Sequence, residues 1–357
     1  MQKKLIALAV AGLMSAPVFA QSNVTIYGLI DMGYKWQGNN IDSGVGSRSA
    51  VDSGITAGNR LGFRGTEDLG NGLKASFVLE TGLNGDRAGY TGDGFGHRQS
   101  YLALSGGFGT VALGRQYTPQ HLWTAAADPF GKGNVGSAGN VLAQDARLDN
   151  LAAYISPTFG GFSVVAAITN SHTGNESADN KGGTGLRDVR VWALAPSYKN
   201  GPLFVGLNMH QARPNAQNVN TEAIKVWDLI GSYDFGVVKV GALYGRRNTE
   251  DRRVDRDVDI TQWMVGVTVP VGANGKVLAS YNHRKTDDEN VAGDAKIGQW
   301  AVGYEHALSK RTSLYGAYAF QNQNSEQKAL GNVSVGDASG DGLGYRKGLA
   351  VGVRHTF

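Results

Sequence analysis

The stretch RLGFRGTEDLG, residues 60–70, can belong to either of two kinds of β-sheet. With the two-residue period of a strand, both of its arginines lie on one face with Gly62, and Leu61 and Phe63 lie on the other. In a soluble sheet the apolar face would meet a core and the charged face would meet water. In a transmembrane barrel the apolar face meets lipid and the charged face meets an aqueous lumen. The rest of the chain decides between the two.

Composition narrows the class of protein. The chain of 357 residues has no cysteine, which excludes disulfides, thiolate metal sites and cysteine nucleophiles. Its 52 glycines are about twice average usage while prolines number only 8, a balance that favours many tight turns over low-complexity disorder. The formal net charge is only +4, and so slight an excess predicts no nucleic-acid partner.

The first twenty residues have the layout of a secretory signal peptide. Lys3 and Lys4 precede an apolar stretch, and small residues end at Ala20. We expect residues 1–20 to be removed and residues 21–357 to form one exported domain, because no linker or composition shift divides them. No further apolar run reaches the roughly 18 residues that a membrane-spanning helix needs.

Short turn sequences recur along the chain at intervals that suit β-hairpins. Each interval holds two strands of about ten residues and one longer connection. Between the turns the apolar residues alternate with period two, as in residues 73–80, 162–168, 203–209 and 263–269. The predicted short turns are 68–72, 106–109, 156–161, 199–202, 234–236, 270–275 and 307–312.

Longer polar or glycine-rich connections separate these hairpins. Seven short turns and eight long loops make fifteen connections, which join sixteen strands and leave both termini on the short-turn side. The predicted long loops are roughly 38–57, 85–97, 118–146, 171–186, 212–222, 247–258, 285–295 and 322–344.

The chain ends on an alternating strand, YRKGLAVGVRHTF, with Phe357 as its last residue. Pairing of this strand with the first one, NVTIYGLIDMGYKW, would leave no open edge in lipid. A barrel of about sixteen strands is wide enough to hold water, so Arg60 and Arg64 are predicted to face the lumen. Aromatic residues group near both strand ends as two interfacial girdles would: Phe159, Phe162, Tyr198, Phe204, Tyr233, Phe235, Tyr304 and Phe357 beside short turns, and Tyr34, Trp36, Tyr244 and Tyr345 toward long loops.

Several of these stretches resemble the general porins of Gram-negative bacteria, in the branch found in beta-proteobacteria. The resemblance covers the mature chain in order and is carried by NVTIYGLIDMG, NRLGFRGTEDLGNGLKASFVLE, GGFGTVALGRQYTP, DNLAAYISPTFGGFS, LSKRTSLYGAYAF and the terminal GVRHTF.

This resemblance implies an all-β, sixteen-stranded antiparallel transmembrane barrel with short periplasmic turns and long extracellular loops. It also implies a homotrimer in the outer membrane, in contact with lipid and lipopolysaccharide, that lets small hydrophilic solutes diffuse passively. The third loop, 118–146, would fold inward and narrow the pore.

The resemblance also suggests which charges line the constriction. Matched by motif, the wall arginines are Arg60 of RLG, Arg98 of RQSYLAL and Arg147 just before DNLAAY. Glu80, which faces inward by parity, and Asp128 of DPFG in the third loop are the candidate acids. Guanidinium groups stay charged at physiological pH and low-dielectric walls focus their field, so we expect a preference for anions.

Other charged residues are weaker candidates for the pore constriction. Arg64 and Lys74 are expected in the lumen but below its narrowest zone, because they lie near a short turn. Arg115 shares the parity of outward-facing Val111 and Leu113, so it requires a bulge or a place in a trimer interface. For each constriction arginine the alternative is a wall salt bridge or a solvated loop charge.

Catalytic and metal-binding motifs are absent from the sequence. It has no Gly-x-Ser-x-Gly elbow, His-Glu-x-x-His pair or phosphate loop. Asp337 and Asp341 are weak loop candidates for calcium, and no other metal or cofactor is predicted. Two alternatives to a general pore stay open: a channel that prefers small organic acids, and a barrel enzyme or adhesin that works through its loops.

Overall fold

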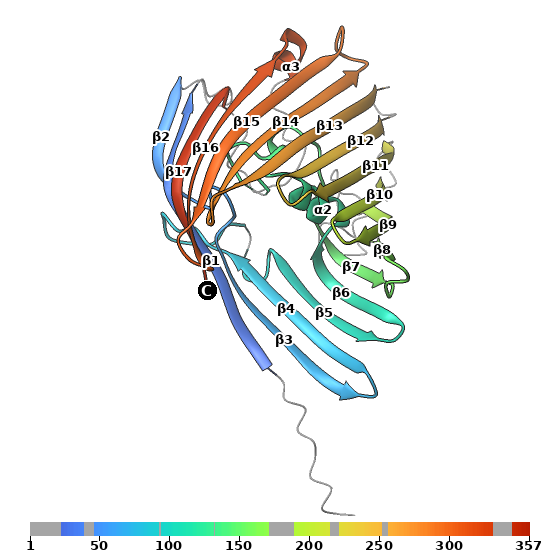
Figure 1. The fold of residues 1–357 in the computed structure, drawn as a ribbon. Helices are drawn as coiled ribbons and strands as arrows, with labels where there is room; N and C mark the ends of the chain where they lie inside the picture. Colours follow the sequence, from blue (N-terminus) through green and yellow to red (C-terminus); the bar gives the residue numbers. More distant parts are fainter. Residues whose placement is uncertain are drawn as a thin grey trace, which may run out of the picture.

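The computed structural model describes residues 23–38, 46–92, 94–131, 133–170, 189–214, 221–251, 256–330 and 345–357. In these residues seventeen strands form one antiparallel sheet, which closes because β1 (Asn23–Gly38) pairs with β17 (Lys347–Thr356) (Figure 1). β2 (Ser47–Ser53) and β3 (Arg60–Gly70) pair with successive halves of β1 and therefore share one position in the wall. The wall thus has sixteen positions, which confirms the predicted barrel.

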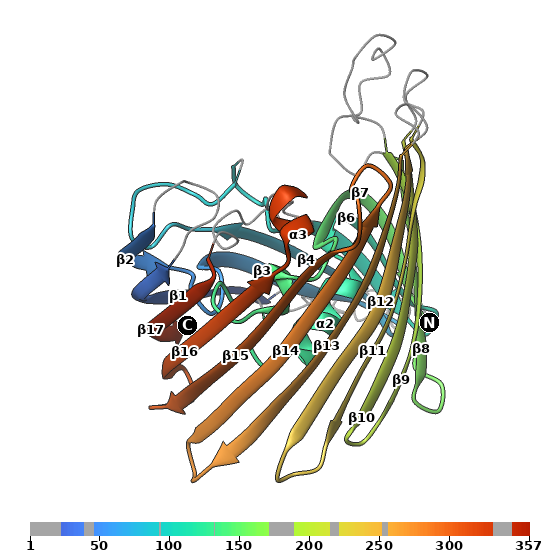
Figure 2. The same ribbon diagram turned by 90° about the horizontal axis from the view of Figure 1, so that it is seen from above.

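The strands differ in length around the wall. Five consecutive strands have only 8 to 10 residues: β4 (Leu73–Gly82), β5 (Gln99–Gly106), β6 (Gly109–Tyr117), β7 (Arg147–Ile155) and β8 (Phe162–Thr169); β17 also has 10. Those with 12 to 16 residues are β1, β9 (Val189–Asn200), β10 (Leu203–Pro214), β11 (Thr221–Asp234), β12 (Lys239–Asp251), β13 (Arg256–Val271), β14 (Gly275–Asp288), β15 (Ala295–Ala307) and β16 (Thr312–Gln323). β4 to β8 are neighbours in the sheet and form one side of the barrel (Figure 2). We name this side the low wall because its strands are short.

Short helices complete the described structure. α2 (Pro119–Ala127) and the 3-10 turn η1 (Ala138–Asn140) belong to the third loop, and α3 (Ser325–Leu330) follows β16. No helix in the described ranges has both the length and the apolar character needed to cross a membrane.

All seven predicted short turns lie between paired strands, but three predicted long loops were drawn too long. Within them, residues 212–214, 221–222, 247–251, 256–258 and 285–288 belong to strands, because β10 to β14 continue beyond the apolar zone as polar hairpin arms. The predicted first loop, 38–57, likewise contains β2. Backbone pairing does not need apolar side chains, so a polar sequence was mistaken for a loop.

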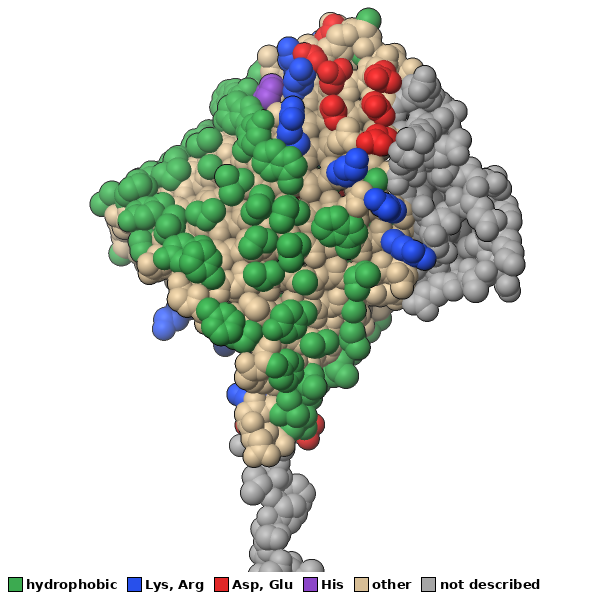
Figure 3. All heavy atoms as spheres, turned by 90° about the vertical axis from the view of Figure 1, so that its right-hand side faces the viewer, with side chains coloured by type: hydrophobic (Ala, Val, Ile, Leu, Met, Phe, Trp, Pro, Cys, Tyr) green, Lys and Arg blue, Asp and Glu red, His purple; other side chains and the backbone are tan. Residues whose placement is uncertain are grey.

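The two faces of the wall have opposite chemistry. On β11 the outward Trp227 and Leu229 are 39% and 48% exposed, whereas the inward Asp228 and Ile230 are fully buried. Figure 3 shows apolar side chains spread over the middle of the outer wall, with charged side chains gathered toward one end. The apolar face is thus the outer face, so the stretch at 60–70 belongs to a barrel of the membrane type.

The aromatic girdles are present, with two corrections. Phe204, predicted for the short-turn girdle, lies inside the barrel, where its ring centre is 5.5 Å from that of Trp123 in α2. Exposed aromatics near the short turns include Phe159, Phe162 and Phe235, and on the long strands the outward pairs Trp227–Tyr244 and Trp263–Tyr281 have ring centres 5.6 and 5.2 Å apart. Tyr345, which was assigned to the girdle, is fully buried instead. Its hydroxyl contacts the third loop inside the barrel, and this pairing is not visible in the local sequence.

Closure of the sheet brings the last residue onto the first strand. The backbone N–H of Gly28 donates to Phe357 O at 3.0 Å, and the N–H of Phe357 donates to Gly28 O at 3.1 Å. A Cβ at position 28 would lie 2.2 Å from the Phe357 ring. The absence of a side chain at Gly28 is therefore what lets the carboxy-terminal aromatic ring lie against the seam.

Candidate functional site

The third loop, 118–146, returns into the barrel and lies against the inner faces of the long strands. Thr118 caps α2 by accepting a hydrogen bond from the N–H of His121 at 3.2 Å, and Pro119 begins the helix. The helix packs against β10, β11 and β12, inside the ring of strands (Figure 1). Its Gln120 Nε2 donates to Asp228 Oδ2 of β11 at 2.7 Å, which anchors the helix to the wall.

The rest of the loop is held mainly by neutral amides. Ala143 N–H donates to Gln262 Oε1 of β13 at 2.7 Å, and Gln299 Nε2 of β15 donates to Gly136 O at 2.9 Å. Asn140 Nδ2 donates to the hydroxyl of Tyr345 at 2.8 Å. These bonds fix the loop along the inner side of β11 to β15.

An ionic cluster holds the end of the loop. The carboxylate of Asp145 lies 2.8 Å from His210 Nε2 of β10 and 3.1 Å from Arg247 Nη1 of β12. This charged cluster therefore fixes the end of the loop to β10 and β12, just before the chain enters β7.

Between β2 and β3 the wall itself bends toward the loop. The carboxylate of Asp31, on β1, accepts hydrogen bonds from Thr56 N–H at 2.7 Å and Ala57 N–H at 2.9 Å. Ile55 is buried in one cluster with Phe130 of the third loop, and its carbonyl accepts from the N–H of Asn134 at 2.6 Å. We name residues 54–59 the inward segment; it immediately precedes Arg60.

Five side chains on the wall formed by β3 to β7 make a continuous row, which we name the arginine ladder. Its members are Arg60, Glu80, Arg98, Tyr117 and Arg147. Arg98 Nε donates to Glu80 Oε1 at 2.8 Å, while Arg60 Nε lies 3.8 Å from Glu80 Oε2. Arg98 Nη2 and Arg147 Nη2 donate to the Tyr117 hydroxyl at 2.7 and 3.2 Å. The Arg147 guanidinium also lies 4.8 Å from the centre of the Tyr117 ring.

The ladder carries a net positive charge. Two of its three guanidinium groups, those of Arg60 and Arg98, lie beside its one carboxylate, Glu80, which also accepts a hydrogen bond from the Tyr27 hydroxyl at 3.0 Å. Glu80 and Arg98 are mostly buried, whereas the side chains of Arg60 and Arg115 on the same wall are 27% and 28% exposed. Because arginine side chains stay protonated at physiological pH, the positive charge of the ladder is fixed.

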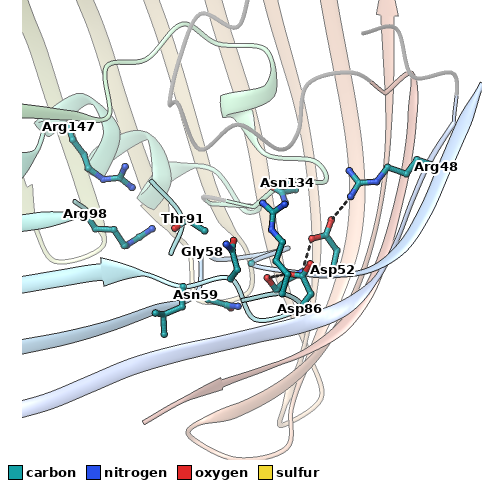
Figure 4. Close-up of a pocket in the computed structure, with 14 residues that line it drawn as sticks. Arg48, Asp52, Gly58, Asn59, Asp86, Thr91, Arg98, Asn134 and Arg147 are labelled. Carbon is teal, nitrogen blue, oxygen red and sulfur yellow. Dashed lines mark hydrogen bonds and ion pairs between the residues drawn. The ribbon is translucent and has the colours of Figure 1, made fainter. Parts of the chain in front are cut away.

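A polar pocket of about 220 Å³ adjoins the ladder (Figure 4). Arg98 and Arg147 reach it from one side, Arg48 and Asp86 lie on the other, and Gly58 of the inward segment lies between them. A Cβ at Gly58 would lie 2.9 Å from Arg98 Nη1, so the glycine keeps room for that guanidinium. Further lining residues include Asn59, Arg87 and Asn134.

Four of the five predicted site residues come together, and Asp128 does not join them. Arg60, Glu80, Arg98 and Arg147 are all in the ladder. The carboxylate of Asp128 is only 4% exposed and accepts hydrogen bonds from Phe130 N–H at 3.0 Å and Ala138 N–H at 2.7 Å. It shapes the third loop from within instead of facing the arginines.

The structure also places the secondary residues. Arg64 lies with its guanidinium 5.2 Å from the ring centre of Tyr27, whose hydroxyl points to Glu80. Lys74 is exposed, on the same face of β4 as Glu80 and nearer the short turn. Asp337 and Asp341 lie outside the described residues, and no group of three histidines, aspartates or glutamates suited to a metal occurs within them.

Sequence reasoning missed the tyrosines and left Arg115 open. Tyr117 and Tyr27 tie the charged residues together, but nothing in their sequence context distinguishes them from girdle aromatics. Arg115 turns inward because the pairing of β6 with β7 shifts between Gly114 and Gln116, and it forms an ion pair with Asp149. Of the two explanations offered for Arg115, the bulge is confirmed.

Comparison with known proteins gives consistent matches. The model of a family described as Gram-negative porin matches residues 7–326. Outer membrane porin protein 32 of Delftia acidovorans is 35% identical, and an outer membrane porin protein of Bordetella pertussis is 30% identical, each over the full length of both chains. The solved structure of an anion-selective porin from Comamonas acidovorans has a TM-score of 0.76 and 30% identity, covering 94% of this chain and all of its own.

The buried carboxyl of Asp128 should make the third loop sensitive to pH. Burial raises the pKa of Asp128 to about 7, although the N–H groups of Ala138 and Phe130 lower it, whereas its ordinary value is 3.8. The native loop then binds a proton that the unfolded loop has lost, so the contribution of Asp128 to stability is full below pH 4 and disappears as pH rises through 7. We expect hydrogen-exchange protection of residues 128–140, corrected for intrinsic rates, to fall several-fold between pH 5.5 and 8.5.

The control for this experiment is Asp128→Asn, which keeps the shape of the side chain but cannot titrate. Its protection should stay level over the same pH range. A wild-type profile without the step, or the same step in the variant, would contradict the assignment.

Proposed function

The chain belongs to the Gram-negative porin family, and from that premise we propose that the arginine ladder borders the narrowest part of its pore and makes the channel prefer anions. As a porin, the protein is a channel of the bacterial outer membrane and not an enzyme. It forms a water-filled path for passive diffusion of ions and small hydrophilic solutes.

The observation that carries this proposal is the unbalanced charge of the ladder. The third loop covers the inner side of β10 to β15, and the ladder lies on the opposite wall, so solutes pass between the two. Three fixed positive charges beside one carboxylate attract anions and repel cations where low-dielectric walls focus the field. The 30% identical protein from Comamonas is named an anion-selective porin, which supports the same preference.

Replacing Arg60, Arg98 and Arg147 together with glutamine should remove the preference for anions. Glu80 would then be the dominant charge of the ladder, so the zero-current potential under a potassium chloride gradient should move through zero to the cation-selective sign. The measurement is made on purified protein in a planar bilayer of neutral lipid.

The matched control removes the same charge from outside the lumen. Lys225, Arg246 and Lys296 are exposed, on the outward faces of β11, β12 and β15. Their triple replacement by glutamine should leave the zero-current potential at the wild-type value. Equal shifts in both triple variants would show that net charge, and not the ladder, sets selectivity.

We also propose that the protein is a homotrimer associated through its low wall. β4 to β8 have only 8 to 10 residues each, and the outward side chains of β5 and β6 form a continuous apolar surface. Leu102, Leu104, Val111 and Leu113 are 40% to 61% exposed in the single chain. An apolar surface can be covered either by lipid or by another copy, and the trimer of related porins is the arrangement that the family implies.

A charge at the centre of this surface should dissociate the trimer. Leu113→Arg places a guanidinium where another copy would pack, so native mass spectrometry in mild detergent should find monomers. The control is Leu229→Arg, on the long wall, where the exposed leucine would face lipid in either case. That variant should stay trimeric, and the same oligomeric state in both variants would reject the low wall as the interface.

A further proposal concerns lipopolysaccharide, whose phosphates would lie beside the upper ends of the long strands. Basic side chains there alternate with acids: Lys225 lies 3.1 Å from Glu250, and Lys285 lies 2.9 Å from Asp294. Lys296 is also exposed at this level, and Figure 3 shows charged side chains gathered at this end of the wall. Exposed ammonium and guanidinium groups suit phosphate contacts.

The rim variant that serves as the selectivity control should therefore lose lipopolysaccharide. Protein with glutamine at positions 225, 246 and 296 is expected to co-purify with several-fold less lipid A phosphate per chain than wild type. The ladder variant, with the same change in charge, should retain the wild-type amount. Unchanged lipopolysaccharide in the rim variant would reject this surface.

A further inference from the structure

The inner face of β14 carries a positive charge that is almost fully buried. Arg284 is 5% exposed, and its Nε is buried without a hydrogen-bond partner. Within the described part of the chain its guanidinium takes part in no ion pair or hydrogen bond. Nε is shut off from solvent, and an unpaired charge that is mostly removed from water is costly in folding, so a compensating group would stabilise this arginine.

The neighbour of Arg284 on the same face is also unsatisfied. Asn282 is fully buried, and both Nδ2 and Oδ1 lack a partner. Residues two apart on a strand face the same way and lie about 7 Å apart, which is within reach of one arginine side chain. The Arg284 guanidinium and the Asn282 amide are thus buried together, and neither makes a hydrogen bond among the described residues.

The third loop explains why these side chains are buried yet unpaired. On β13, Gln262 lies opposite Arg284 but is bonded to Ala143 and to Asp228. On β15, Gln299 lies opposite Asn282 but donates to Gly136 O and Ser137 O. The loop is thus fixed to the strands on both sides of β14 and bridges over it.

The carboxylates around Arg284 are engaged elsewhere. Asp288, four residues along the same face of β14, accepts a hydrogen bond from the N–H of Asn290 at 3.1 Å. Asp228 accepts from Gln120 at 2.7 Å and Gln262 at 3.1 Å, and it lies three strands away on β11. Asp128 is bonded to amides of its own loop, and Asp145 to His210 and Arg247. None of these carboxylates neutralises Arg284.

We propose that a small inorganic anion, of the size range from chloride to phosphate, binds between the third loop and β14, held by the Arg284 guanidinium and the Asn282 amide. The anion neutralises the buried arginine and accepts the N–H groups that the described chain leaves unpaired. Its place on the wall opposite the ladder makes it a structural site, separate from the path of permeating solutes. Because the loop lies over the site, bound anion also holds the loop against β13 to β15.

Bromide identifies such a site directly. Crystals of the wild-type protein in sodium bromide should give an anomalous difference peak about 3.5 Å from the Arg284 guanidinium, as expected for a charge-assisted contact. Ordered water alone at this position would overturn the proposal. This result needs no variant, so it stands even where a substitution at position 284 prevents folding.

A solution measurement distinguishes a working site from binding at crystal concentration only. Replacing 150 mM chloride with gluconate, an anion much larger than phosphate, should lower hydrogen-exchange protection of residues 134–146 by about threefold or more. Arg284→Met should show the low protection in both salts, whereas the control Arg64→Met should respond as wild type does. Protection that is independent of the anion in wild type would reject the site, whatever the outcome for ladder selectivity.

Discussion

Every backbone N–H and C=O group that faces lipid must be paired within the protein, and this constraint governs the rest of the molecule. It requires the sheet to close, which the seam between Gly28 and Phe357 accomplishes. Closure then gives each strand one face toward lipid and one toward water, so the polar residues of a barrel lie inside it. The lumen of such a barrel is wide, and the third loop narrows it by forming hydrogen bonds with the polar inner face.

The sequence predicted the architecture wherever contact with lipid determines the type of side chain. Turn residues and period-two alternation located all seven short turns, because lipid demands apolar residues on one face of every strand. Beyond the apolar zone that demand ends, and residues 247–258 read as a loop although most of them are strand. The interruption between β2 and β3 was equally hidden, since it depends on Asp31, which comes from another strand.

The residues of the candidate site also fall into two groups: those that strand parity places, and those whose position depends on contacts with distant parts of the chain. Arg60 and Glu80 could be assigned inward because strand parity fixes the face of a residue. Asp128 could not be placed, because the direction of a loop carboxylate depends on which backbone amides it finds, here those of Phe130 and Ala138. The inward direction of Arg115 depends on a register shift that the sequence does not reveal. The role of Tyr117 depends on two arginines from different parts of the wall.

The way in which the loop is held also bears on how its pore selects ions. Gln120, Gln262 and Gln299 anchor most of the loop with neutral amides. An anchor built from ion pairs would bring further charges of both signs close to the solute path and weaken the field of the opposite wall. Apart from the Asp145 cluster at the end of the loop, neutral amides keep the loop in place without adding charge. The ladder can then act through its own excess of arginine over Glu80, which makes loop anchoring and charge selection separable properties of one lumen.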